Sequence, residues 1–304
     1  MKVFVAGGTG VLGRAALRAL AAAGHDVWAA ARGLEKAALV RRLGAEPVDV
    51  DLYDPDAVRR AVAGCQAVLR LTTKIPPTAE RGRPEAWAET NRLRTEGARV
   101  LVDAAIAARA RVYMHESIVF VYADAGGAWI TEDSRTDAEG DPVLEAALAG
   151  EGEAARFARG GGRGVVLRFA RFYGPDEPST QETAARVRGG ALEVVGNGHH
   201  YTSWIYVADA GRAVAAALDA PSGVYNVCDD EPVPLADYLG AVAAALGAPQ
   251  PRPAPEGPAT GADRASRQRS LRVSNARFTA ATGWVPFVRS VEDGWRLIAA
   301  AARP

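Results

Sequence analysis

The sequence predicts an α/β fold, built on a Rossmann-type, doubly wound parallel sheet with a smaller, mixed C-terminal part. Short apolar runs alternate with helical patterns through about the first 170 residues. A glycine-rich turn follows the first apolar run directly. The spacing between the runs suits right-handed crossovers, which join parallel strands.

The first half of the chain reads as six strands joined by helices. Lys2–Ala6 is an apolar strand, and Leu12, Ala16, Leu17 and Leu20 form one stripe of the helix that follows it. Glycines end several of the helices. The expected strands are 2–6, 26–31, 46–50, 66–71, 111–121 and 164–169, and the expected helices are 13–23, 34–43, 55–63, 84–109 and 143–159.

The second half is less regular. Residues 224–227 are expected to add a strand to the main sheet, and residues 248–263, rich in Pro and Ala, to form a loop. We assign residues 1–170 to a Rossmann domain to which 203–228 return, and residues 171–304 to a smaller domain. The expected helices are 179–189, 207–219, 235–247, 274–282 and 290–302.

Composition excludes several classes of protein. The 36 basic and 36 acidic residues cancel, so a nucleic-acid or acidic-membrane partner is not expected. Cys65 and Cys228 are the only cysteines, which excludes a disulfide framework and a cysteine zinc cluster. No apolar run reaches the roughly 18 residues of a membrane span, and no signal peptide is evident. We expect a soluble, cytoplasmic protein that acts on a small molecule and holds no metal.

The distribution of lysine is unusual. Lys2, Lys36 and Lys74 are the only lysines, and no tyrosine lies between Tyr122 and Tyr173. Codon bias explains the small total, but the positions exclude any mechanism that needs a lysine in the last three quarters of the chain.

The turn after the first strand predicts a dinucleotide site. Gly7, Gly10 and Gly13 form a G-x-x-G-x-x-G pattern between a strand and a helix, with free backbone N–H groups expected at the helix start. The alternative is an ordinary βα turn that happens to be rich in glycine. The loop residues expected to touch the cofactor are Gly7, Thr9, Gly10, Val11, Leu12 and Gly13.

The end of the second strand favours NADP(H) over NAD(H). Arg32 stands there without an adjacent acidic residue, and a guanidinium suits the 2′-phosphate of NADP. The alternative is a solvated arginine at a strand end. Asp51 and Leu52, after the third strand, are expected to flank the adenine.

These features resemble the extended short-chain dehydrogenase/reductase superfamily, which contains the NAD-dependent sugar epimerases and dehydratases. The resemblance covers nearly the whole chain and implies that the smaller C-terminal domain binds the substrate. It also implies a homodimer through helices 84–109 and 143–159. Its further motifs are Asp51-Leu52, Asn91, residues 167–175, 204–209, 223–227 and 282–286.

The sequence departs from the superfamily's pattern at the catalytic residues. The superfamily uses a Ser/Thr with a Tyr-x-x-x-Lys pair, in which Tyr exchanges a proton with the reacting oxygen. Aligning Glu153 with the acidic residue that follows this motif puts Glu145 at the Tyr place and Ala149 at the Lys place. Because this region has no lysine and no tyrosine, no small shift in the alignment restores a Tyr-x-x-x-Lys pair. Ile118 stands where the catalytic Ser is usual, with Ser117 one residue earlier.

Replacement groups are sought at the C-terminal ends of the strands, where such sheets bind ligands. Lys74 is the one lysine in a loop facing the cofactor, and Leu71, Thr72 and Thr73 precede it along the same edge. Each group also has an ordinary structural role as its alternative, such as an exposed lysine or a hydrogen-bonded core glutamate. The candidate catalytic residues are Ser117, Glu116, Lys74, Tyr122 and Tyr173.

Three functions remain open. The first is an atypical NADP(H)-binding oxidoreductase, or an epimerase/dehydratase-like enzyme, that acts on a small molecule with a relocated proton donor. The second is a nucleotide-binding regulator without hydride chemistry, and the third a non-redox cyclase or dehydratase on the same scaffold. The sequence does not identify the substrate.

Overall fold

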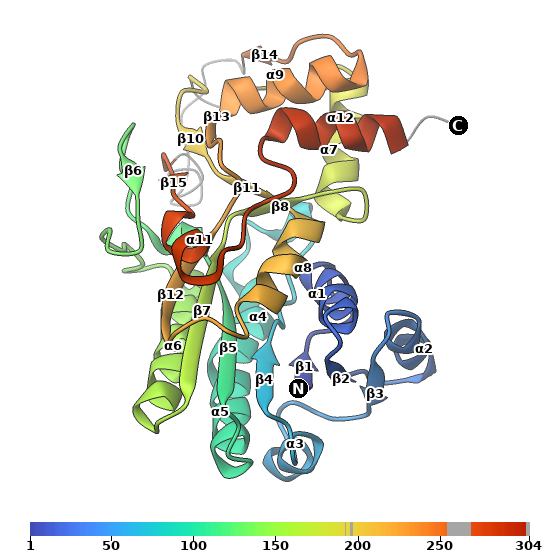
Figure 1. Cartoon of the computed structure of the whole chain (residues 1–304). Coiled ribbons are helices and arrows are strands. Elements are labelled where there is room, and N and C mark those ends of the chain that lie inside the picture. Colours follow the sequence, from blue (N-terminus) through green and yellow to red (C-terminus); the bar gives the residue numbers. More distant parts are fainter. Residues whose placement is uncertain (192, 195–196, 254–268, 302–304) are drawn as a thin grey trace.

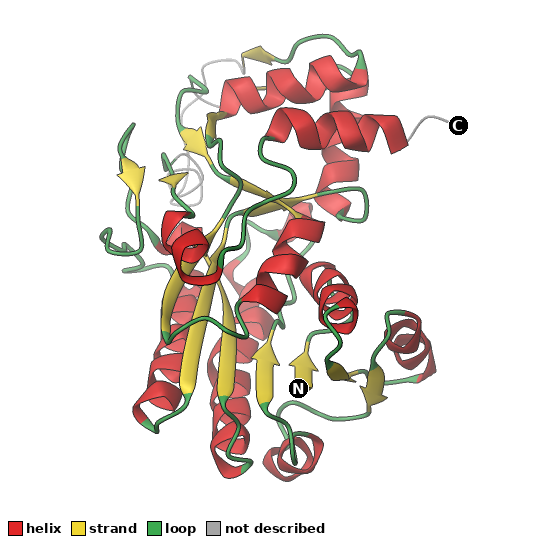
Figure 2. Ribbon diagram, viewed as in Figure 1, coloured by secondary structure: helices red, strands yellow, loops and turns green. Residues whose placement is uncertain are grey.

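The computed structural model describes residues 1–191, 193–194, 197–253 and 269–301. At its centre is a seven-stranded parallel sheet in the order β12-β7-β5-β4-β1-β2-β3 (Figures 1 and 2). This confirms the predicted α/β class and the doubly wound sheet. The strands are β1 (Lys2–Ala6), β2 (Asp26–Ala30), β3 (Glu46–Val48), β4 (Ala67–Arg70), β5 (Val112–Ile118), β7 (Arg163–Phe169) and β12 (Gly223–Val227).

Helices cover both faces of the sheet. On one face Leu17 of α1 and Val214 of α8 enter the same apolar core. On the other face a second core takes side chains from α3, α5 and α6, including Leu101 and Phe157. The helices of this part are α1 (Val11–Ala22), α2 (Leu34–Arg42), α3 (Pro55–Ala61), α4 (Ala88–Arg92), α5 (Ala98–Ala107), α6 (Pro142–Arg159) and α8 (Val207–Ala216).

The long helix expected over 84–109 is not regular. It begins as a 3-10 turn, Pro84–Trp87, continues as α4, and passes through a π-helical turn, Leu93–Gly97, into α5. Arg94 lies in the π-helical turn and is buried. A π-helical turn holds an extra residue within the helix, and here it accompanies a charged side chain directed into the core.

The strand expected over 111–121 is shorter. β5 ends at Ile118, and a 3-10 turn, Val119–Val121, follows. The apolar run continues through this turn, but the ladder with β7 stops at the pair Ile118–Phe169. Hydrophobic sequence alone does not show where the neighbouring strand ends.

The C-terminal elements gather beyond the C-terminal ends of the main strands (Figure 1). The expected helices are present as α7 (Pro178–Arg188), α9 (Leu235–Leu246), α11 (Ala276–Thr282) and α12 (Val291–Ala301). Several short strands were not expected, because two or three residues carry no readable period. They are β6 (Trp129–Ile130), β8 (Arg171–Tyr173), β9 (Glu193–Val194), β10 (Tyr201–Thr202), β11 (Trp204–Tyr206), β13 (Val233–Pro234), β14 (Arg252–Pro253) and β15 (Arg272–Val273).

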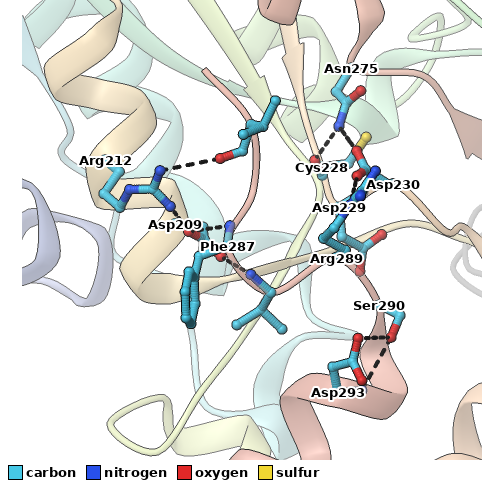
Figure 3. Close-up of polar contacts among 12 residues, drawn as sticks. Asp209, Arg212, Cys228, Asp229, Asp230, Asn275, Phe287, Arg289, Ser290 and Asp293 are labelled. Carbon is cyan, nitrogen blue, oxygen red and sulfur yellow. Dashed lines mark hydrogen bonds and ion pairs between the residues drawn. The ribbon is translucent and has the colours of Figure 1, made fainter. Parts of the chain in front are cut away.

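Asp209 joins the end of the chain to α8. Its carboxylate accepts hydrogen bonds from the backbone N–H groups of Phe287 and Val288, at 3.0 and 2.8 Å, and from Arg212 (Figure 3).

The boundaries of the two domains stay a prediction. Most of the loop expected over 248–263 lies outside the described residues. Within the described residues, no helix has the length and apolar character needed to cross a bilayer.

Candidate functional site

The glycine loop lies at the topological switch point of the sheet, between the ends of β1 and β4. Gly7 has a φ of +98°, and a Cβ there would come within 2.5 Å of the Leu71 carbonyl oxygen. A Cβ on Gly13 would lie 2.0 Å from the Gly7 carbonyl oxygen. Both glycines therefore allow backbone contacts that any side chain would prevent. The loop stands where open α/β sheets bind their ligands.

Gly10 has a different reason to be glycine. Among the described residues, its Cβ would meet only the Gly7 carbonyl oxygen, at an ordinary 3.5 Å. Gly10 also caps α1, whose first turn has no side-chain cap and no acidic residue. Unsatisfied N–H donors and the positive end of the helix dipole therefore stand beside an open position. The pyrophosphate of a dinucleotide fits this position.

The adenosine end of the site carries both charges. Arg32 and Asp51 lie 4.0 Å apart, with 66% and 53% of their side chains exposed. Leu52 is half-buried beside them. The carboxylate was not expected this close to the guanidinium, because the two residues come from the ends of different strands. The Arg32 guanidinium therefore has a carboxylate beside it.

The loop after β4 places its side chains in two environments. Leu71 and Thr72 are buried against the glycine loop, whereas Thr73 and Lys74 are exposed. The backbone of Lys74 is fixed, because its N–H donates to the Thr90 hydroxyl at 3.2 Å and its carbonyl accepts from the same hydroxyl at 2.5 Å. The exposed Lys74 side chain is thus carried on an anchored backbone.

Glu116 lies near the C-terminal end of β5, with 5% of its surface exposed. Nη1 of Arg70 donates to its Oε2 at 2.9 Å and to its backbone carbonyl at 3.0 Å. Nη2 of Arg70 donates to the Thr72 carbonyl at 2.5 Å. The buried guanidinium thus ties the ends of β4 and β5 together and holds the Glu116 carboxylate through one of its two oxygens.

Ser117 is fully buried and faces α6. Its hydroxyl donates to Oε1 of Glu151 at 2.5 Å, and Arg168 grips the same carboxylate through Nε and Nη2, at 2.9 and 2.6 Å. The guanidinium also lies over the ring of Tyr122, 4.7 Å from its centroid. The Ser117 hydroxyl therefore donates its hydrogen bond to a buried ion pair.

The position of Glu151 changes the alignment of α6. Glu153, taken above as the reference acid, is instead partly exposed and pairs with Arg156. Glu145 and Ala149, assigned to the Tyr and Lys places, are both exposed. With Glu151 as the reference, the two places move by two residues, to Val143 and Ala147. The absence of a Tyr-x-x-x-Lys pair does not depend on this choice.

Two buried side chains that pack against α6, Arg94 and His115, were not among the candidate site residues. Arg94 donates through Nη1 to the Val143 carbonyl at 3.1 Å, and burial lowers its pKa to about 10. The His115 ring packs on Gly150, where a Cβ would lie 2.4 Å from it. Burial, with help from Arg70 and Arg94, lowers the pKa of His115 well below its usual value. A charged residue in a long amphipathic helix gave no sequence signal, because such residues usually face solvent.

The two candidate tyrosines are fully buried. The Tyr122 hydroxyl donates to Oδ1 of Asn226 at 2.8 Å, and the Tyr173 hydroxyl donates to the Ser290 carbonyl at 3.1 Å. Burial raises the pKa of both phenols. Both hydroxyls therefore donate to other groups inside the protein.

Comparison with known proteins agrees with this arrangement. Residues 3–228 match the model of the NAD-dependent epimerase/dehydratase family. The chain belongs to this family. Its fold is similar to that of a Thermus thermophilus UDP-glucose 4-epimerase in complex with NAD, with 26% identity, a TM-score of 0.79, and coverage of 99% of this chain and 98% of that one. A human epimerase family protein with NADPH has a TM-score of 0.82 at 24% identity, with 99% of each chain covered.

A curated relative covers the whole length. A 3-diazoavenalumate denitrifying reductase from a Streptomyces species is 37% identical over 97% of this chain and 99% of its own. The family binds a nicotinamide cofactor, and the protein is an oxidoreductase- or epimerase-type enzyme.

Proposed function

We propose that this family member is an NADP(H)-dependent reductase whose substrate accepts a hydride without receiving a proton from a Tyr–Lys pair. The observation that carries this proposal is that the proton-donating residues usual in the family are missing or buried. The chain holds no Tyr-x-x-x-Lys in α6, and the hydroxyls of Ser117, Tyr122 and Tyr173 are all buried donors to other groups.

Proton supply separates two kinds of reduction. Reducing a ketone produces an alkoxide, which needs an acid within hydrogen-bond reach. Reduction of the diazonium form of a diazo compound needs no such acid. A hydride forms the new C–H bond while the C–N bond breaks and its electron pair leaves with nitrogen, so that R–N₂⁺ and H⁻ give R–H and N₂. The denitrifying reductase among the relatives is named for a diazo compound, which supports this second kind.

The chain would hold the cofactor through backbone N–H groups and the Arg32 side chain. The glycine loop and the first turn of α1 would bind the pyrophosphate, and Arg32 the 2′-phosphate. Leu71, Thr72 and Thr73 would border the nicotinamide ribose. A bound reduced nicotinamide supplies the hydride. Glu116 and Lys74 are the polar groups that we place beside the substrate, whereas we assign Ser117, Tyr122 and Tyr173 to the buried framework.

The test offers 3-diazoavenalumate and NADPH deuterated at C4 to the purified protein. We expect consumption of NADPH, release of N₂ and deuterium on the carbon that carried nitrogen. A matched reaction with a β-keto acid should be at least about a hundredfold slower, because no Tyr–Lys pair is in place to protonate the alkoxide. Rapid reduction of the keto acid alone would overturn the proposal. Binding of NADPH without turnover of either compound would favour the nucleotide-binding regulator instead.

The homodimer stays a prediction, which sedimentation of the same sample tests.

A further inference from the structure

Two buried arginines and one buried glutamate gather where β4 and β5 end. Arg70 is the last residue of β4 and is fully buried, Glu116 lies near the end of β5, and Arg94 is 1% exposed. The charges of Arg70 and Glu116 both act on the pKa of Arg94, so the three groups are near one another. We call these three residues the buried charge cluster.

The buried charge cluster carries an excess of positive charge. Arg70 and Glu116 form an ion pair at 2.9 Å, and Arg94, whose pKa burial lowers to about 10, is still protonated near pH 7. His115 adds no charge, because burial and the two arginines hold its pKa well below the usual value. Asp141 also acts on Arg94, but it is partly exposed and accepts from two backbone N–H groups at the start of α6.

The hydrogen bonds of the two arginines are incomplete. Nε of Arg70 and Nε of Arg94 are buried and have no partner among the described residues. Among these residues, Glu116 is the one carboxylate that hydrogen-bonds to either guanidinium, and it is bonded to Arg70 alone. An excess charge in a protein core costs stability, and π-helical turns such as the one that holds Arg94 are frequent at functional sites. The arrangement therefore points to a function rather than to packing.

The buried charge cluster lies behind the backbone that borders the glycine loop. Nη2 of Arg70 donates to the Thr72 carbonyl at 2.5 Å, and the Thr72 backbone nitrogen is 2.9 Å from the position of a Cβ on Gly7. A dinucleotide bound at the switch point extends to both sides of it. With its adenosine end at Arg32, beyond β2, its nicotinamide ring extends towards the ends of β4 and β5, where the cluster lies.

We propose that the buried charge cluster makes the protein bind the reduced nicotinamide cofactor in preference to the oxidised one, and that Arg94 sets this preference. The oxidised ring carries a positive charge and the reduced ring is neutral, whereas the riboses and phosphates of the two forms are the same. Excess positive charge behind the ring therefore repels only the oxidised form. At an effective dielectric constant of about 20, a unit charge about 10 Å away changes such a ratio by about tenfold.

The inference goes beyond the proposed function, because it concerns the redox state of the cofactor and needs no particular substrate. It requires only a nicotinamide cofactor, which the family binds. A protein with this preference takes up the reduced cofactor and releases the oxidised one after the hydride has left, which suits a reductase.

The first test compares the affinities of NADPH and NADP⁺ for the full-length protein by calorimetry, or of NADH and NAD⁺ if that pair binds more tightly. We expect the reduced form to bind at least about tenfold more tightly than the oxidised form. For a two-electron couple, a tenfold ratio raises the potential of the bound cofactor by about 30 mV, which a redox titration measures independently. Equal affinities, or tighter binding of the oxidised form, would overturn the proposal.

Variants of Arg94 test the source of the preference. Arg94→Met and Arg94→Gln remove the excess charge and leave Arg70 paired with Glu116, so neither creates an unpaired buried charge. Each should reduce the affinity ratio to within about threefold, whereas Arg94→Lys, which keeps the charge, should retain it. Arg99→Met is the matched control, because Arg99 is exposed on α5, pairs with Asp103 and is screened by solvent.

Thermal melts first show which of these variants are folded. Folded Arg94→Met or Arg94→Gln protein with the ratio of the unaltered protein would refute the role of Arg94. A loss of affinity that is equal for both forms would refute it too, because that result is expected of a merely structural residue.

This proposal and the proposed function fail separately, because the affinity ratio is measured without substrate. Equal affinities in a protein that reduces the diazo compound would reject only the role of the buried charge cluster. A tenfold preference for the reduced cofactor without turnover of the diazo compound would reject only the reductase.

Discussion

The Glu151 carboxylate on α6 receives a hydrogen bond from Ser117 on β5 at 2.5 Å, and it forms an ion pair with Arg168 on β7 at 2.6 Å. Both charged side chains are more than nine-tenths buried. A helix and two strands are thus joined by one carboxylate, and the Arg168 guanidinium lies over the ring of Tyr122. Because a buried ion pair is costly to break by removing one partner, this contact makes a strong prediction about stability.

Glu151→Gln should lower the free energy of unfolding by about 3 kcal/mol, because it leaves the Arg168 guanidinium buried without an opposite charge. Glu153→Gln is the control on the same helix. Its ion pair with Arg156 is partly exposed, and we expect a loss below about 1 kcal/mol. Urea titration of both variants measures the difference. Equal losses would show that Glu151 is not the residue that joins α6 to the sheet.

Gly10→Ala should fold normally and bind the dinucleotide at least about tenfold more weakly. Its added Cβ finds ordinary space within the chain and points to the position proposed for the pyrophosphate. Gly13→Ala should lose stability and binding together, because its Cβ would lie 2.0 Å from a backbone oxygen. Thermal melts and NADPH fluorescence separate the two variants. A Gly10→Ala protein with unchanged NADPH affinity contradicts the proposed binding mode.

Arg32→Ala should weaken NADPH by about tenfold and change NADH by less than about twofold, since only the 2′-phosphate distinguishes the two cofactors. Asp51→Asn should strengthen NADPH, because it removes the carboxylate 4.0 Å from the guanidinium. Fluorescence titrations with both nucleotides give the ratios. A preference for NADH in the unaltered protein would argue against the NADP(H) proposal.

Asp229 predicts a dependence of stability on pH. It is 1% exposed and follows β12, next to Cys228 and Asp230 (Figure 3), and neither of its carboxylate oxygens accepts a well-formed hydrogen bond among the described residues. Burial raises its pKa well above the usual value, the Asp230 charge adds to this, and the backbone N–H of Glu231 offsets a part. The folded state therefore binds this proton more tightly than the unfolded state does.

The consequence follows from linkage. The stability due to the Asp229 proton is fully present below the unfolded pKa of about 4, and it falls by up to about 1.4 kcal/mol per pH unit until the folded pKa is reached. Asp229→Asn removes this effect, so its urea midpoint should fall less than that of the unaltered protein as the pH rises above about 4. Parallel curves for the two proteins would show that Asp229 does not titrate in this range.

Local sequence patterns predicted most of the strands and helices in the Rossmann half of the chain. The strands from Lys2–Ala6 onward, the helix stops and the glycine loop each depend on residues close together in the chain, where period and turn chemistry are readable. The two-residue strands of the C-terminal part were missed for the opposite reason, since each exists only through a partner far away. Tyr201–Thr202, for example, pairs with Val233–Pro234.

The sequence by itself determined the fold class, the position of the glycine loop and the absence of a Tyr–Lys pair, because backbone periodicity and the absence of a residue type need no coordinates. Only the tertiary structure decided what surrounds each polar group. It showed Ser117 bound to Glu151, Arg94 directed inward by a π-helical turn, and Asp51 beside Arg32. Such neighbours come from strands and helices distant in sequence, and burial and pairing, which control a side chain's charge and reactivity, are properties of that packing.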